Sequence, residues 1–225
     1  MVKRLFTRRA EPSGWLSVRL SNGELISLCE YTAVDVTREI GGRTYFVISD
    51  GWIGVGKEAS LTSANAGKYL SPDGPSGAAV MLATYNGAPA EENSPFKGRL
   101  LQQWATLSFD GKTATVTLNS VWNGEFHPIP PGSHAILSPD YSHAAIATTG
   151  YANATPGMIG NDVWFPIGLN GQLVNSSRYV HVGHLSDGCV TVHQLERWTA
   201  VYQYLISHRA PGSAGKRVGT LTVRK

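Results

Sequence analysis

The stretch YVHVGHLSDGCVTV, residues 179–192, contains one of the two cysteines of the chain and two of its seven histidines. Its first four residues, 179–182, alternate in the way that predicts a β-strand. Gly183 and Gly188 then indicate a turn. Because a helical pattern follows, we expect Cys189 to lie in the turn between a strand and a helix.

Downstream of this stretch, apolar residues recur at the three- and four-residue spacing of a single helix face. They are Leu195, Trp198, Val201, Tyr202 and Leu205. Thr191 and Gln194 match the pattern of a capping box at the start of this helix. This is the one helix that the sequence predicts with a clear apolar face.

Upstream, the chain consists of short alternating segments separated by turns. The turn SNG (21–23), the pair Gly41-Gly42 and the pair Asp110-Gly111 each predict a hairpin tip. The proline-rich segment 127–137 indicates a rigid turn that leads into a strand. We therefore predict a mostly β fold, with a soft boundary near residue 95 that separates a β-rich N-terminal region (1–95) of unknown role from a second domain (96–225).

Composition narrows the class of protein. With 225 residues and 42% hydrophobic content, the chain can bury a substantial core without help from disulfides. A net charge of +3 and 16% charged residues argue against a nucleic-acid partner. No stretch approaches the roughly 18 apolar residues of a membrane-spanning helix, and the opening MVKRLFTRRA is not followed by the apolar core of a Sec signal. We expect a soluble chain with no Sec signal.

The residue types around Cys189 indicate nucleophilic chemistry. A thiol attacks a carbonyl carbon as its thiolate, so it needs a base or a positive field nearby. If the turn brings His181 to face Cys189, with Cβ atoms roughly 5 Å apart, the imidazole can accept the thiol proton. A helix that begins just beyond Cys189 would lower the pKa of the thiol further. Gly188 would let the backbone approach a substrate, and the N–H groups of residues 188 and 189 would form an oxyanion hole.

Other readings of the same residues stay open. Cys189 can be an ordinary core residue, or it can form a structural disulfide with Cys29 that would consume the nucleophile. His184 and His193 are alternative bases, which we expect to be solvated. His181, His184, His193 and Cys189 could together supply metal ligands, but their spacing matches no structural zinc pattern. We therefore predict no metal.

Two segments resemble a known family. Residues 179–183 followed by 186–190 resemble the catalytic motif of L,D-transpeptidases with a YkuD-type domain, in which a histidine-containing strand precedes a Ser/Thr-x-Gly-Cys turn. Residues 130–136, PPGSHAI, are similar to the Pro-x-Gly-x-Tyr-x-Ile segment upstream in that family. The resemblance covers roughly residues 99–208 and implies a β-sandwich catalytic domain with one helix after the catalytic cysteine.

The chain also departs from the commonest form of the motif. Asp187 stands where the family has a second histidine, Thr191 stands where it has an arginine, and the insert after His181 is short. The compact arrangement looks more like the L,D-transpeptidase effectors that type VI secretion delivers into rival bacteria. This resemblance implies action in the periplasm or cell wall, delivery by a specialised secretion system, and a secretion-apparatus or immunity protein as partner.

The resemblance implies a cysteine-dependent enzyme that acts on tetrapeptide stems of peptidoglycan, by L,D-transpeptidase exchange or crosslinking or by L,D-carboxypeptidase action, without a cofactor. Cys189 would be the nucleophile, His181 the base and Gly188 part of the oxyanion hole. Candidate substrate contacts are Arg178, Tyr179, His184, Ser186 and Asp187, of which Ser186 can also stabilise the turn.

The competing hypothesis is a non-catalytic cell-wall or glycan-binding module of a phage or secretion apparatus, in which the β-rich N-terminal part does the recognition and the cysteine is incidental. Five tryptophans are available for stacking on sugars, although core packing explains them equally well. They are Trp15, Trp52, Trp104, Trp122 and Trp164.

Overall fold

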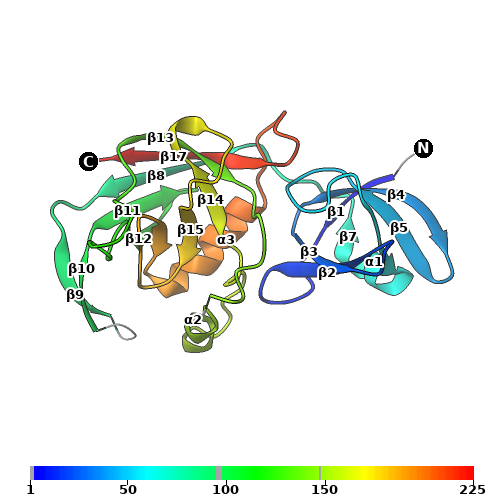
Figure 1. Ribbon diagram of the computed structural model, residues 1–225, viewed down its shortest axis with the longest axis horizontal. Coiled ribbons are helices and arrows are strands. Elements are labelled where there is room, and N and C mark those ends of the chain that lie inside the picture. The colour runs from blue at the N-terminus through cyan, green and yellow to red at the C-terminus, as the bar shows by residue number, and fades with distance from the viewer. Residues whose placement is uncertain (1–2, 95–97, 147) are drawn as a thin grey trace.

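The computed structural model describes residues 3–94, 98–146 and 148–225, which form two lobes side by side (Figure 1). Strands account for 42% of the residues and helices for 13%, so the predicted mostly β class is confirmed. One lobe is an N-terminal sheet, and the other is a barrel that contains residues 179–192.

The N-terminal lobe is a single seven-stranded sheet of order β3-β2-β6-β5-β4-β1-β7, and its strand pairs are antiparallel. Alternate residues of the central strands point inward, and Phe46 and Ile48 are fully buried. Helix α1 (Ser63–Tyr69) begins at Thr62, whose hydroxyl accepts a hydrogen bond from the Asn65 N–H. The strands are β1 (Lys3–Thr7), β2 (Trp15–Leu20), β3 (Leu25–Cys29), β4 (Ala33–Ile40), β5 (Arg43–Ile48), β6 (Glu58–Thr62) and β7 (Leu70–Ser71).

The second lobe is a closed barrel of order β11-β12-β16-β15-β14-β13-β17-β8. A closed barrel therefore stands where we expected a sandwich of two sheets. A separate hairpin, β9 with β10, projects from the barrel (Figure 1). The strands are β8 (Ala79–Tyr85), β9 (Ala90–Ser94), β10 (Gly98–Gln102), β11 (Trp104–Phe109), β12 (Lys112–Thr117), β13 (Gly132–Leu137), β14 (Phe165–Gly168), β15 (Tyr179–Val182), β16 (Val190–Val192) and β17 (Arg217–Arg224).

The predicted hairpins are confirmed. Strands β2 and β3 pair across the SNG turn, and β4 and β5 pair up to Gly41 and Gly42. Asp110 and Gly111 join β11 to β12 with φ angles of 47° and 68°. Two left-handed residues in succession are what a two-residue hairpin turn requires, which explains the Asp-Gly pair at this position.

Helix α3 (Trp198–Ile206) confirms the predicted apolar face, since Trp198, Val201, Tyr202 and Leu205 are all buried. The predicted capping box is wrong. Thr191 lies inside β16, and the Gln194 side chain binds the backbone of Thr115 and the carboxylate of Glu196. The remaining helical turns are α2 (Thr149–Ala154), η1 (Leu169–Gly171) and η2 (Leu195–Arg197).

The change from one lobe to the other falls earlier than predicted. Residue 95 itself lies outside the described residues, but β8 already belongs to the barrel, where it pairs with β11 and β17. The sheets therefore divide between Ser71 and Ala79. The polar residues 86–94 lead into and form β9 of the projecting β9–β10 hairpin, so this part of the chain is not a linker.

The two lobes share buried contacts. The Trp15 side chain, from β2, belongs to the apolar core of the barrel, and its Nε1 donates to the Asp162 carbonyl at 3.3 Å. Glu30 accepts hydrogen bonds from the Tyr202 hydroxyl at 2.8 Å and from Arg9 at 3.2 Å. The N-terminal lobe is therefore packed onto the loop before β14 and onto α3.

Among the described residues, no helix combines the length and the apolar character needed to cross a membrane.

Candidate active site

Strands β15 and β16 bring His181 and Cys189 to neighbouring strands of the barrel. The strands are parallel, with Val180 opposite Val190 and His181 opposite Thr191. The Thr191 hydroxyl lies 3.0 Å from His181 Nε2, so these two side chains share one side of the sheet. Cys189 directly precedes β16, and its thiol interacts with the backbone of Tyr179, two residues before His181.

This arrangement corrects the predicted facing pair. We expected the chain to turn back through Gly183 and Gly188 so that His181 would lie opposite Cys189. Parallel strands ordinarily need a crossover of about a dozen residues or more, but residues 183–189 return to the start of β15 without a helix. Among the described residues, no hydrogen bond joins Cys189 Sγ to either nitrogen of His181.

The His181 ring is held by two hydrogen bonds. Its Nδ1 lies 2.9 Å from the Val182 carbonyl, and its Nε2 lies 3.0 Å from the Thr191 hydroxyl. A carbonyl only accepts, so Nδ1 carries the proton of the neutral ring and Nε2 is an acceptor. The Thr191 hydroxyl also lies 3.2 Å from the Leu185 carbonyl, so its single proton is shared between these two acceptors. Burial lowers the pKa of His181 to about 4, so the ring is neutral near pH 7 and Nε2 is its basic atom.

Cys189 is a neutral thiol in this structure. The residue is 8% exposed, and burial raises the pKa of its thiol to about 11, although the Tyr179 backbone and the charge of Arg178 lower it. The predicted lowering of this pKa is wrong for a structural reason. The residues after Cys189 form β16, and α3 starts only at Trp198, so no helix N-terminus points at the sulfur.

Ser186 organises the loop between the two strands. Its side chain is 1% exposed; the hydroxyl accepts from the Cys189 N–H at 3.0 Å and donates to the Cys189 carbonyl at 2.9 Å. Ser120 holds the backbone N–H and carbonyl of Ser186 in turn. Ser186 therefore holds the turn through both backbone groups of Cys189.

The backbone N–H of Cys189 is therefore engaged, which corrects half of the predicted oxyanion hole. The Gly188 N–H has no hydrogen bond to any residue that the structure describes, so it remains the available donor. Gly188 has a φ of +75°, and a Cβ there would lie 2.8 Å from the His127 carbonyl. A glycine is required at this position because residues 126–127 pack against it.

Arg178 packs against Gly188 on the same side as residues 126–127, with its Nε 3.1 Å from where a Cβ on Gly188 would lie. Its guanidinium stacks over the Phe126 ring at 4.7 Å, and its Nε is buried without a hydrogen-bond partner among the described residues. Its one hydrogen bond in this part of the structure is a long one of 3.5 Å to the Ser176 carbonyl. A half-buried cation with so few partners is suited to bind an anionic group.

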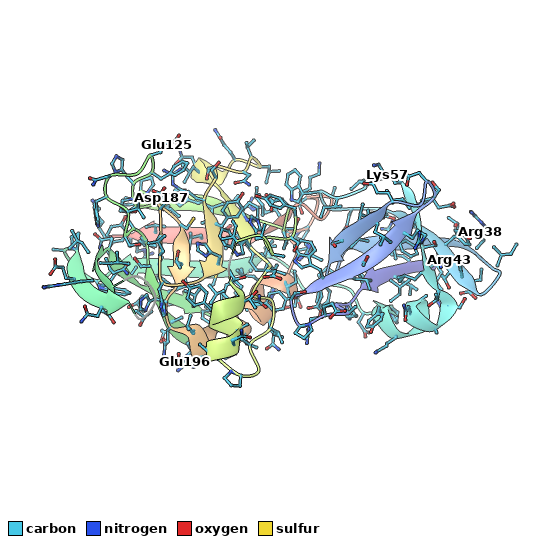
Figure 2. The ribbon with its side chains drawn as sticks, turned by 60° about the horizontal axis from the view of Figure 1, so that its bottom comes forward. Arg38, Arg43, Lys57, Glu125, Asp187 and Glu196 are labelled. Atoms are coloured by element: carbon cyan, nitrogen blue, oxygen red, sulfur yellow. The ribbon has the colours of Figure 1, made fainter. Side chains whose placement is uncertain are left out.

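Asp187 contributes a negative charge that raises the pKa of Cys189. Its Oδ1 is buried without a hydrogen-bond partner among the described residues, and a Cβ on Gly124 would come within 2.7 Å of it. Figure 2 shows Asp187 and Glu125 on the same side of the barrel. Segment 124–127 therefore covers both Asp187 and Gly188.

Tyr179 and His184, two of the predicted substrate contacts, are each held by neighbouring side chains. The Tyr179 hydroxyl accepts from Asn175 at 2.7 Å, and burial raises its pKa to about 12. His184 is buried and stacks on His193 with ring centroids 4.2 Å apart, which corrects the expectation that His184 is solvated. Burial lowers the pKa of both histidines, that of His193 to about 4.

The alternatives for the cysteines are also resolved in part. Cys29 and Cys189 are both free and buried, so no disulfide joins them in this structure. Cys29 contacts Thr32 and Arg209 at the junction of the lobes. Within the described part of the chain, no three histidine, cysteine or acidic side chains cluster as metal ligands.

Sequence reasoning missed two groups of neighbours. One is the segment that packs on Gly188, which carries Phe126 and His127. The other is a stack of aromatic rings in which Trp164 lies 4.0 Å from His181 and 4.4 Å from His143. Neither group is near residues 179–192 in sequence, so no local spacing could indicate it.

No family model matches this chain, and neither the curated proteins nor the solved structures contain a match to it.

Proposed function

We propose that the protein is a cysteine-dependent enzyme of the L,D-transpeptidase type that acts on tetrapeptide stems of peptidoglycan. The proposal is supported by the position of Cys189 directly before β16, next to β15, which carries His181, and by the Val182 carbonyl, which fixes the His181 ring so that Nε2 is its basic atom. A nucleophile, a base and a third group that orients the base are what covalent catalysis needs.

In the proposed reaction, Nε2 of His181 exchanges its hydrogen bond with Thr191 for one with the Cys189 thiol and accepts its proton. The sulfur attacks the carbonyl carbon before the terminal D-alanine, and the Gly188 N–H stabilises the oxyanion. The C–N bond then breaks, the imidazolium returns the proton to the leaving amine, and D-alanine departs. An amine then attacks the thioester and releases the Cys189 thiol: the amine of a free amino acid gives exchange, a stem-peptide amine gives a crosslink, and water gives hydrolysis.

The site also has groups suited to a charged peptide. The positive charge of the Arg178 guanidinium lowers the pKa of Cys189. Because this guanidinium has few hydrogen-bond partners, it can hold a substrate carboxylate. A resting pair of neutral thiol and neutral imidazole implies that the proton moves only when the substrate is bound. Because segment 124–127 packs on Gly188, this segment must shift for the carbonyl to reach the proposed oxyanion donor.

A product assay tests this proposal. Purified protein is incubated with disaccharide-tetrapeptide muropeptides, with and without an acceptor, and stem masses are measured. We expect loss of D-alanine or its exchange. Cys189→Ala abolishes the reaction, whereas Cys29→Ala, which removes the other buried cysteine, retains it. Unchanged stem masses with the native protein, while an active L,D-transpeptidase works alongside, would count against the proposal.

The histidine variants separate the roles within the site. His181→Ala should reduce the rate by roughly 10²–10⁴-fold, the range for loss of a general base. His184→Ala should cost much less, because the His184 ring packs edge-on against Tyr151 and at a tilt against His193. Equal losses in the two variants would remove the special role of His181.

A second candidate function is the non-catalytic wall-binding module. One observation favours it: a groove of about 680 Å³ is lined by Trp122, Tyr85 and several prolines. Trp122 is 38% exposed, whereas Trp15 and Trp164 are buried and unavailable to sugars. Cosedimentation of Cys189→Ala protein with purified sacculi tests this candidate; binding that Trp122→Ala abolishes would support it.

A further inference from the structure

The sheet of the N-terminal lobe has one apolar face and one polar face. Buried residues such as Val18 and Phe46 form the apolar face and the core of the lobe. On the polar face, Arg19 of β2 lies opposite Ser60 of β6, and Ser60 lies opposite Tyr45 of β5. Directly opposite residues of antiparallel strands project to the same side of a sheet, so these three residues form one row across β2, β6 and β5.

A hollow of about 280 Å³ lies over this row. The side chains that line it include Arg19, Arg43, Tyr45, Glu58 and Ser60. Its volume is at the lower end of the range for ligand pockets, which suits a small polar group better than a large ligand. Figure 2 shows Arg43 on the N-terminal lobe and Asp187 on the barrel, so the hollow is separate from the candidate active site.

Ser60 holds the Arg43 guanidinium at the hollow. The Ser60 hydroxyl accepts from Arg43 Nε at 3.2 Å and from Nη2 at 2.9 Å, and it donates to the Arg19 carbonyl at 3.4 Å. Ser60 is buried, whereas Arg43 is half-buried. Nη1 of Arg43 forms no hydrogen bond with any residue that the structure describes, so this edge of a fixed guanidinium is available to a ligand.

Glu58 is the one acidic residue that lines the hollow, and its charge is already matched. Both of its carboxylate oxygens accept hydrogen bonds from Arg38. Arg38 also stacks over the Tyr45 ring, with its guanidinium carbon 4.3 Å from the centroid. Glu58 therefore does not offset the charges of Arg19 and Arg43.

Arg19 and Arg43 give the hollow an excess of positive charge. Arg19 is exposed, and its Nη1 donates to the Gly23 carbonyl at 3.3 Å. Within the described part of the chain, neither arginine forms an ion pair with a carboxylate. Guanidinium groups bind carboxylates and phosphates through pairs of N–H donors. The two oxygens of a carboxylate match one guanidinium, whereas the oxygens of a phosphate point in several directions and can accept from both arginines.

We propose that the hollow between Arg19 and Arg43 binds a phosphate group, either free or carried by a sugar. The inference goes beyond the proposed function, because it gives the N-terminal lobe a ligand of its own and involves no residue of the barrel. Binding leaves the pair of Arg38 and Glu58 intact.

The test is a titration of the full chain, followed in amide NMR spectra, with inorganic phosphate, glucose 6-phosphate and glucose. The ionic strength is held constant, so that screening of surface charges does not change. We expect saturable shifts of the backbone amides of β2, β5 and β6 with both phosphates and none with glucose. Tighter binding of glucose 6-phosphate would assign the site to a phosphorylated sugar, and equal affinity would assign it to the phosphate group alone.

Arg19→Gln and Arg43→Gln should each weaken phosphate binding by roughly tenfold, because each removes charge-assisted hydrogen bonds. Lys68→Gln is the matched control, since it removes one positive charge from an exposed position of α1 outside the hollow. Arg19 is exposed and donates a single side-chain hydrogen bond, to Gly23, so Arg19→Gln should fold even if Arg43→Gln does not.

Two results would overturn the inference. One is the absence of saturable shifts in β2, β5 and β6 when phosphate is added. The other is an equal phosphate affinity in Arg19→Gln and Lys68→Gln, which would mean that only the net charge of the protein matters. Neither result depends on turnover of muropeptides, so the phosphate site and the proposed function can fail separately.

Discussion

The chemistry of Cys189 at the residue scale is set by burial. Burial raises the pKa of its thiol to about 11 and lowers the pKa of His181 to about 4. Both groups are therefore uncharged near neutral pH, and the pair differs from a preformed thiolate and imidazolium. Reactivity must then come from proton transfer within a substrate complex, not from a thiolate that is already present.

The reactivity of the free enzyme follows from this protonation state. In Cys29→Ala protein, where Cys189 is the remaining cysteine, the alkylation rate with iodoacetamide should rise by about tenfold per pH unit between pH 7 and 9. The thiolate fraction grows in that proportion below the pKa. Rates measured by intact mass at several pH values check this. A plateau below pH 8 would mean that the thiolate is already formed.

His181 also makes the stability of the fold depend on pH. Its pKa is about 4 when folded and near 6.5 when unfolded, so the unfolded chain binds more protons between these values. Stability is full above pH 6.5 and falls as the pH drops towards 4, by roughly 2–3 kcal/mol from this residue. Urea unfolding at pH 7 and 4.5 measures the loss. His181→Asn, which cannot titrate, should lose less; equal losses would contradict this explanation.

At the scale of elements, the site depends on a short loop between two parallel strands. Ser186, in the middle of loop 183–189, binds both backbone groups of Cys189 at the end of the loop. Segment 124–127 then packs on the loop at Gly188. The positions of the sulfur and of its neighbouring N–H donors follow from these contacts more than from the strands.

Gly188→Ala tests the packing of segment 124–127. The new methyl would meet the His127 carbonyl at 2.8 Å and would also force a side chain to adopt a φ of +75°. Gly23→Ala is a matched control, because Gly23 has a φ of +88° and no atom within 4 Å of the added Cβ. We expect Gly23→Ala to cost about 1 kcal/mol and Gly188→Ala to cost at least about 1 kcal/mol more. Equal losses in urea unfolding would mean that segment 124–127 yields freely.

Most elements could be predicted from the sequence because their signals are local. The Asp110-Gly111 turn, the Gly41-Gly42 turn and the apolar face of α3 are each specified by neighbouring residues. The direction of β16 could not be predicted, because a parallel return and a hairpin place the same residues on a strand. The barrel register and the stack on Trp164 depend on residues far apart in sequence.

The candidate site was predictable in its residues but not in its electrostatics. The spacing of His181, Gly188 and Cys189 is visible in the printed sequence; the structure places His181 in β15 and the other two in the loop that leads into the neighbouring strand β16. The sign of each pKa shift depends on how much solvent the rest of the fold removes. A motif does not contain that information.

At the scale of the whole molecule, the two lobes share a core. Trp15 is part of the apolar cluster of the barrel, and the buried Glu30 carboxylate binds Tyr202 of α3. Asp162, whose carbonyl accepts a hydrogen bond from Trp15, lies two residues before Trp164, which stacks on His181. The N-terminal lobe therefore contacts the segment that carries Trp164.

The shared core predicts cooperative unfolding. Fluorescence, which reports buried tryptophans, and far-ultraviolet circular dichroism should give one coincident urea transition for the full chain. Tyr202→Phe, which removes a hydrogen bond to a buried carboxylate, should shift both signals together by about 1–3 kcal/mol. Two separate transitions, with only one moved by Tyr202→Phe, would show that the lobes unfold independently.

The proposed covalent step at Cys189 can be detected by trapping its thioester intermediate. The protein is mixed with tetrapeptide muropeptide, quenched in acid within seconds and analysed by intact mass and peptide mapping. We predict an adduct whose added mass equals that of the muropeptide minus D-alanine. It should map to Cys189 and be absent from Cys189→Ala. Product formation that survives in Cys189→Ala, or an adduct that maps to Cys29, would contradict it.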